Sequence, residues 1–274
     1  MAAEYKTIHP VKYYRDYLAH DVRPDGRAFQ KFRPASVNVG SIKTADGSSL
    51  VKIGNTTVVC GIKLEIAPPK AEEPGKGFFV PNVTLPPLCS PKFRPGPPSD
   101  QAQVASHFVA EVVSNSACID LGELCIVPEK LVWVLHCDLY CLDHDGALLD
   151  ACVIALIAAL RTVTFPVVEY DADKDTTVVS EKKRKSLTVH SAPVATTFAI
   201  FDDDILITDP TTEEETLSTG LLTIAVQGQK LCSVYKPGGS PLSEDQLQDC
   251  ISKARKRAEQ INQLVETALN PPER

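Results

Sequence analysis

The most regular pattern in this chain is an alternation of apolar and polar residues over positions 57–66. This period of two predicts a strand with one buried face. Residues 131–142 are apolar at both odd and even positions apart from His136 and Asp138. This pattern predicts a central strand that is covered on both faces. After a turn at 143–146, residues 147–160 are almost continuously apolar, and we expect a helix packed between two layers.

Weaker patterns extend this picture along the rest of the chain. Helices are predicted at residues 13–18, 101–116 and 243–269, and strands at 36–42, 187–190, 196–201, 205–208, 221–227 and 230–235. Asp46-Gly47 and Gly54-Asn55 mark two turns, the first with hairpin chemistry. The polar, charged stretch 171–185 is the expected boundary between two units. The pattern predicts an α+β fold with two sub-domains: an N-terminal helix and arm (1–30), a first domain (31–170) and a second (186–270).

Composition narrows the class of protein. The chain has 274 residues, 43% of them hydrophobic and 23% charged, which is typical of a globular protein. A net charge of −7 argues against a free-standing nucleic-acid binder with a basic surface, so RNA contact would need a local patch or partner chains. None of the nine cysteines forms a C-x-x-C pair, and four lie in apolar stretches, which indicates buried thiols in a reducing compartment. No stretch reaches the roughly 18 apolar residues of a membrane span, and we expect a soluble intracellular protein.

Four motifs, the first of them made of two segments, occur in an order that resembles the RNase PH family. Residues 23–27 (Arg-Pro-Asp-Gly-Arg) and 54–58 (Gly-Asn-Thr-Thr-Val) resemble the family's opening, and 143–150 resembles its central turn and helix. Residues 209–215 and 236–240 are similar to one branch in particular, the non-catalytic ring subunits of the eukaryotic RNA exosome.

This resemblance implies an RNase PH fold, a β-α-β-α arrangement related to the second domain of ribosomal S5-type proteins. It also implies a hetero-hexameric ring with other RNase PH-like subunits, cap proteins and an associated nuclease, through which single-stranded RNA passes. The expected function is that of a non-catalytic scaffold that supports 3′-to-5′ RNA processing and degradation, including rRNA maturation and mRNA turnover. The implied locations are the nucleus, nucleolus and cytoplasm, with no membrane partner and no cofactor.

The start of the helix at 101–116 is the main reason to expect no catalysis. The resemblance implies that catalytic members hold inorganic phosphate at a serine- and arginine-bearing helix start. Here that position reads Pro97-Pro98-Ser99-Asp100. Two prolines remove N–H donors and Asp100 adds a negative charge where an anion would sit. Ser99 is predicted to be an ordinary N-cap.

The acidic positions support the same expectation of no catalytic and no metal-binding residue. The family carries two aspartates about six residues apart in its second half, and here Glu215 and Leu221 fall near those positions. A leucine neither ligates a metal nor moves a proton. Residues 213–215 are predicted to form a solvated acidic turn and residues 202–204 a hairpin turn. Asp150 is predicted to cap N–H groups in the first turn of its helix, and His136 to be a partnered core histidine.

Candidate RNA contacts lie in a proline-rich loop. Lys92, Phe93 and Arg94 place two cations around an aromatic ring, a pattern that offers backbone charge and a stacking face together. Arg23, Asp25 and Arg27 are instead predicted to form a turn flanked by ion-pairing arginines. The basic run 182–185 fits a nuclear-import patch, an RNA contact or a solvated linker.

One alternative function stays open at this level. The chain would be an active phosphate-dependent 3′-to-5′ exoribonuclease if a neighbouring subunit supplied the missing arginines to a shared site.

Overall fold

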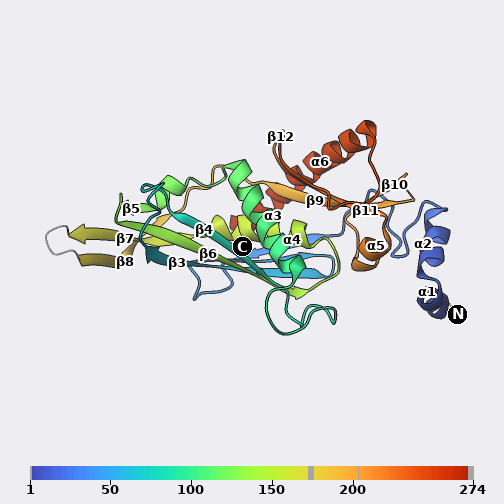
Figure 1. Ribbon diagram of the computed structural model, residues 1–274, viewed down its shortest axis with the longest axis horizontal. Coiled ribbons are helices and arrows are strands. Elements are labelled where there is room, and N and C mark those ends of the chain that lie inside the picture. The colour runs from blue at the N-terminus through green and yellow to red at the C-terminus, as the bar shows by residue number, and fades with distance from the viewer. Residues whose placement is uncertain (1, 172–175, 203, 271–274) are drawn as a thin grey trace.

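The computed structural model describes residues 2–171, 176–202 and 204–270, in two packed sheets with helices between and around them (Figure 1). The α-helices are α1 Ala2–Ile8, α2 Pro10–Leu18, α3 Asp100–Ser116, α4 Leu148–Leu160, α5 Thr212–Leu217 and α6 Glu244–Leu269, with a 3₁₀ turn at Leu121–Leu124. The strands of the first half are β1 Ala35–Val39, β2 Gly47–Ile53, β3 Thr56–Ala67, β4 Phe78–Thr84, β5 Cys125–Val127 and β6 Leu131–Asp143. Those that follow are β7 Thr164–Asp171, β8 Thr176–Ser186, β9 Val194–Phe201, β10 Ile205–Thr208, β11 Gly220–Gln227 and β12 Lys230–Tyr235.

The first sheet has the order β1-β2-β3-β6-β4, with β5 added against β6. Its strands pair antiparallel except for β4, which runs parallel to β6. The alternation at 57–66 is confirmed, because Val58, Cys60 and Ile62 are fully buried on one face of β3. The other face is covered less completely.

The tight hairpin of this sheet lies at the second of the two predicted turns. Ile53 pairs with Thr56, so Gly54 and Asn55 form a two-residue loop, and Gly54 has φ of +56°. The hairpin chemistry predicted for Asp46-Gly47 is wrong, since Gly47 already lies in β2. A Cβ atom at Gly47 would collide with the backbone carbonyl of Ala159, near the end of α4, and with the side chain of Val163, just after that helix.

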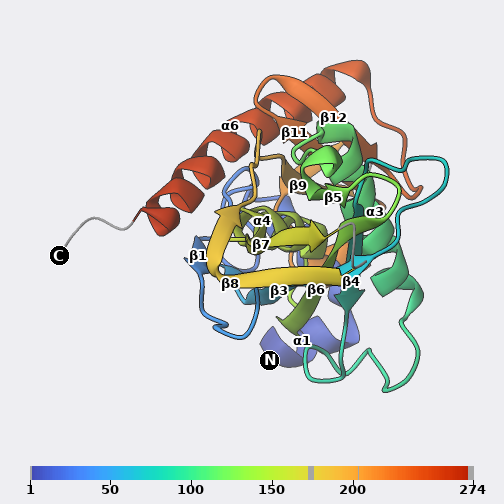
Figure 2. The same cartoon turned by 90° about the vertical axis from the view of Figure 1, so that its left-hand side faces the viewer.

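The second sheet is an antiparallel set in the order β10-β9-β11-β12. Helix α4 lies between the two sheets and contacts β2, β3 and β9, and twelve of its thirteen residues are buried. This confirms a helix packed between layers. Helix α6 covers the other face of the second sheet and reaches β1, as the end-on view shows (Figure 2).

The N-terminal helices lie at one end of the molecule beside α5 (Figure 1). Tyr14 and Leu18 are buried, and Leu18 packs with Phe201 and Ile207 of the second sheet. The arm before the first domain is therefore anchored on the second one.

Three predictions of secondary structure differ from the structure. The stretch 171–185, predicted as a polar boundary, lies largely in strands β7 and β8, which pair with each other. Residues 172–175 of this stretch lie outside the described residues. The predicted strand at 187–190 is only a single bridge between Ile119 and Val189. Strand β4 was not predicted; it contains Pro81, which an edge strand tolerates because its outer N–H needs no ladder partner.

The four predicted helices and the other predicted strands match observed elements within a few residues, which confirms the α+β class. Helices α1 and α5 and strands β2, β5 and β7 were not predicted. Among the described residues, no helix is both long and apolar enough to cross a membrane.

Candidate functional site

The first turn of α3 has the capping geometry that the sequence indicated. The Ser99 hydroxyl accepts a hydrogen bond from the backbone N–H of Ala102 at 3.3 Å, and Asp100 occupies the first turn. The side chain of Gln103 donates back to the carbonyl of Pro98. Ser99 is therefore an N-cap, as predicted, and its oxygen is already engaged with the helix.

Beside this helix start lies a cavity of about 170 Å³ between the two halves of the chain. Its walls come from the start of α3, the start of α4, strands β9 and β11, and the segment that follows β12. The lining residues are Gln101, Val104, Ala105, Leu148, Leu149, Thr197, Glu215, Leu221, Thr223, Tyr235 and Pro237. This lining contains no lysine and no arginine, so nothing in it offers a positive charge to an anion.

Glu215 and Leu221 both line this cavity, as their spacing suggested. Glu215 accepts a hydrogen bond from the backbone N–H of Ala147 at 2.7 Å, at the start of α4. Burial raises the pKa of its carboxyl group to about 7, although the Ala147 N–H opposes this. The one acidic group of the cavity is therefore poorly solvated, and its neighbour Leu221 adds only apolar surface.

The predicted solvated turn at 213–215 is wrong. These residues belong to α5, which begins with a capping box formed by Thr211 and Glu214. Glu214 is buried and paired with Arg23, and Glu213 accepts a hydrogen bond from the hydroxyl of Tyr14 at 2.6 Å. Each of the three carboxylates thus has a structural partner.

Asp150 has a structural role, but its partners are not those predicted. It does not cap its own helix; it accepts hydrogen bonds from the backbone N–H and the hydroxyl of Thr197, at 2.8 and 2.7 Å. That hydroxyl also lies 2.9 Å from the hydroxyl of Thr223. Burial raises the pKa of Asp150 to about 7. The carboxyl group therefore joins α4 to the second sheet directly behind the cavity.

Three arginines, Arg23, Arg27 and Arg33, are engaged in ion pairs where the N-terminal arm meets the first domain. Arg23 is fully buried and contacts Glu214, and Arg27 pairs with Asp25 in the turn that the sequence predicted. Arg33 contacts Asp209 through its side chain at 2.6 Å, and its backbone N–H donates to the same carboxylate. No pattern in the sequence indicates the pair of Arg33 and Asp209, because its members lie 176 positions apart. These guanidinium groups are not free to bind phosphate.

The candidate RNA residues Lys92, Phe93 and Arg94 lie in the loop between β4 and α3. Lys92 and Arg94 are exposed, and the Lys92 ammonium group lies 3.4 Å from the Thr216 hydroxyl. Phe93 packs partly into the core, with its ring centroid 5.8 Å from that of His144 in an edge-to-face arrangement. Lys92 and Arg94 therefore lie at the surface, whereas the ring of Phe93 points toward the protein interior. The ring expected to stack on RNA bases packs against the protein instead.

Other candidate residues are placed as follows. His136 is not a core residue: its side chain is 40% exposed and contacts Glu65 at 3.1 Å. Asp202 pairs with Arg15, whereas residue 203 lies outside the described residues. Within the described ranges, no group of three or more His, Cys, Asp or Glu residues is placed to hold a metal ion.

The basic run at 182–185 lies in β8, so the solvated-linker interpretation is wrong. Arg184 pairs with Asp46 at 2.6 Å, and the Lys185 ammonium group lies 5.8 Å from the ring centroid of Phe165. The side chains of residues 182 and 183 lie outside the described residues.

Residues 31–166 match the first domain of the 3′ exoribonuclease family (RNase PH), and residues 191–257 match its second domain. The chain belongs to the RNase PH family. The two matches contain both sheets and every residue that lines the cavity, and they confirm the predicted two-domain RNase PH fold.

Similar proteins place the chain among the exosome components of this family. It is 40% identical over 254 residues to the exosome complex component rrp43 of Schizosaccharomyces pombe, covering 92% of this chain and 94% of that protein. It is 34% identical to the exosome complex component Rrp42 of Methanothermobacter thermautotrophicus, covering 93% and 94%. These matches confirm the resemblance to exosome ring subunits.

Solved structures agree with these relatives. A chain of the Archaeoglobus fulgidus exosome with RNA bound to the active site superposes with a TM-score of 0.83 at 31% identity, covering 92% of this chain and 96% of that one. An archaeal exosome core chain gives 0.78 at 28% identity, covering 96% and 100%.

Proposed function

We propose that this chain is a non-catalytic ring subunit of the RNA exosome, which scaffolds the ring and lines part of the RNA path. The observation that carries the proposal is the composition of the cavity between the two domains. Attack by phosphate on RNA brings two anionic species together and needs cations around them. The cavity instead presents a half-buried carboxyl group and aliphatic side chains.

The surrounding structure supports the same function. The helix start that faces the cavity has Ser99 engaged as a cap and Asp100 in its first turn. Two buried arginines, Arg23 and Arg33, neutralise Glu214 and Asp209. Each group that would have to bind or activate an anion is therefore occupied in holding the fold together.

The likeness to exosome components supports the proposed assembly into a ring. The partners we propose are other RNase PH-like subunits in a hetero-hexameric ring, with cap proteins and an associated nuclease. The processes are 3′-to-5′ processing and degradation of RNA, including rRNA maturation and mRNA turnover, in the nucleus, nucleolus and cytoplasm. Lys92 and Arg94 are the proposed contacts to single-stranded RNA, with Phe93 fixing their loop.

The test is an assay of phosphorolysis on purified protein. The chain alone, and the chain assembled with its ring neighbours, are incubated with oligouridylate, inorganic phosphate and Mg²⁺, and released nucleoside diphosphate is measured. We expect no release by the chain alone. In an assembly that does release product, Glu215→Gln should leave the rate unchanged. A rate that falls with Glu215→Gln would instead support the alternative of an active site shared with a neighbour.

A further inference from the structure

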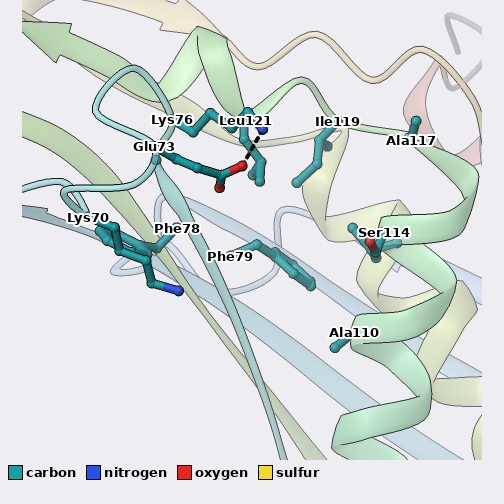
Figure 3. Close-up of a pocket in the computed structure, with 12 residues that line it drawn as sticks. Lys70, Glu73, Lys76, Phe78, Phe79, Ala110, Ser114, Ala117, Ile119 and Leu121 are labelled. Carbon is teal, nitrogen blue, oxygen red and sulfur yellow. Dashed lines mark hydrogen bonds and ion pairs between the residues drawn. The ribbon is translucent and has the colours of Figure 1, made fainter. Parts of the chain in front are cut away.

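A second hollow lies away from the cavity between the domains, at the β4 edge of the first sheet. It has a volume of about 360 Å³ and is enclosed by the loop before β4, the start of β4, the last turns of α3 and the segment that leads into the 3₁₀ turn (Figure 3). None of its lining residues belongs to the cavity between the domains. It is therefore separate from the cavity on whose composition the proposed function rests.

The walls of this pocket leave room for one large apolar side chain. Ala110, Ser114 and Ala117 present small side chains from the end of α3, and the ring of Phe79 points from β4 toward that helix (Figure 3). Ile119 and Leu121 complete an aliphatic wall. The volume is at the lower end of the range for ligand pockets, about 300 to 1,000 Å³. It suits a single anchoring side chain better than a large cofactor.

The mouth of the pocket carries one cation without an ion-pair partner. Lys76 is paired with Glu73 at 2.6 Å. The ammonium group of Lys70 lies 5.7 Å from the ring centroid of Phe78, and it makes none of the ion pairs found among the described residues. In a chain of net charge −7, this leaves a local positive charge beside an apolar hollow. Such a combination attracts a carboxylate placed next to an apolar group.

The edge of β4 adds a backbone donor to the same place. Along this edge the N–H of Gly77 donates to the Leu121 carbonyl, and the N–H of Val83 donates to the Ser106 hydroxyl. Because successive residues of a strand point their N–H groups to opposite edges, the N–H of Phe79 faces the same way, toward the pocket. An extended peptide uses such an edge for a main-chain hydrogen bond while its side chain fills a pocket.

We propose that this pocket is a docking site for an extended acidic peptide of a partner protein, in which an aromatic or branched aliphatic side chain is flanked by Asp or Glu. The anchor fills the space between Phe79 and Ala110, and the flanking carboxylate pairs with Lys70. An RNA strand fits less well, because its phosphates need several cations and Glu73 lies at the mouth.

The test is to select peptides from a random library for binding to the folded full-length chain. Peptides that also bind the Ala110→Trp variant, in which the pocket is blocked, are removed. We expect the retained peptides to combine an aromatic or branched aliphatic residue with neighbouring acidic residues. For the best of them, measured by fluorescence anisotropy, Lys70→Glu should weaken binding about fivefold to tenfold. Lys52→Glu, which changes an exposed lysine of β2, is the matched control and should leave affinity unchanged.

Three results would overturn the proposal. The first is that no peptide distinguishes the wild-type chain from the Ala110→Trp variant. The second is that the retained peptides lack acidic residues or bind Lys70→Glu as tightly as wild type. The third is displacement of the peptides by oligouridylate, which would assign the surface to RNA. If Ala110→Trp unfolds, Ser114→Trp blocks the same pocket from an exposed position and takes its place.

Discussion

Asp150 on α4 accepts two hydrogen bonds from Thr197 on β9, at 2.8 and 2.7 Å, and this pair joins the central helix to the second sheet. The carboxyl group is buried, which raises its pKa from near 4 to about 7. A group with this shift binds its proton more tightly in the folded state than in the unfolded state. Asp150 therefore contributes more to the stability of the folded protein at low pH than at neutral pH.

The first prediction concerns this pH dependence. Between about pH 4 and pH 7 the folded chain holds a proton at Asp150 that the unfolded chain has lost, so the free energy of unfolding falls as pH rises through this window. The Asp150→Asn variant should show a shallower fall, because its amide can accept from the Thr197 N–H and donate to the Thr197 hydroxyl without titrating. Urea unfolding at several pH values measures the slope. Glu259→Gln, at an exposed position of α6, should keep the wild-type slope.

A second prediction concerns the buried ion pair of Arg33 and Asp209. Arg33→Ala leaves the Asp209 carboxylate buried without its main partner, which should lower the free energy of unfolding by about 3–5 kcal/mol. Arg15→Ala removes the exposed pair with Asp202 and should cost less than about 1 kcal/mol. Equal losses in urea unfolding for the two variants would contradict the structural role of Arg33.

A third prediction separates the two possible roles of Ser99. As an N-cap, Ser99→Ala should lower stability by about 1 kcal/mol. It should not alter the response of the unfolding midpoint to added phosphate, because the site binds none. Ser114→Ala, at an exposed position in the last turn of the same helix, should change stability little. Protection by millimolar phosphate that disappears in Ser99→Ala would identify an anion site.

A fourth prediction distinguishes the members of the candidate RNA triplet. In the assembled ring, Lys92→Ala and Arg94→Ala should each weaken RNA binding and reduce the salt dependence of affinity by about one released ion. Phe93→Ala should mainly destabilise the loop, because the ring packs against His144. Filter binding at several salt concentrations, together with thermal unfolding, separates the two effects. A large loss of RNA affinity in Phe93→Ala at unchanged stability would restore the stacking interpretation.

The amino-acid pattern was sufficient for features with a local physical cause. The alternation of β3 and the unbroken apolar run of α4 directly reflect one-sided and all-round burial. The spacing of Thr211 and Glu214 is a capping-box signal and indicates a helix start, whereas the run of acidic residues favours a solvated turn. The partners of Asp150 and Arg33 could not be predicted from the sequence. Thr197 contacts Asp150, and Asp209 contacts Arg33, only when the two domains pack together.

Gly146 lies at the point where the two domains approach most closely. Its φ is +76°, and a Cβ there would collide with the backbone of Pro210 and Thr211. The next residue donates its N–H to Glu215, and Arg33 spans from the first domain to Asp209. Contacts this tight tie the unfolding of one domain to that of the other, so the chain should melt in a single cooperative transition. A subunit of this kind enters an assembly as one rigid block, with no hinge between its halves to absorb the motion of its neighbours.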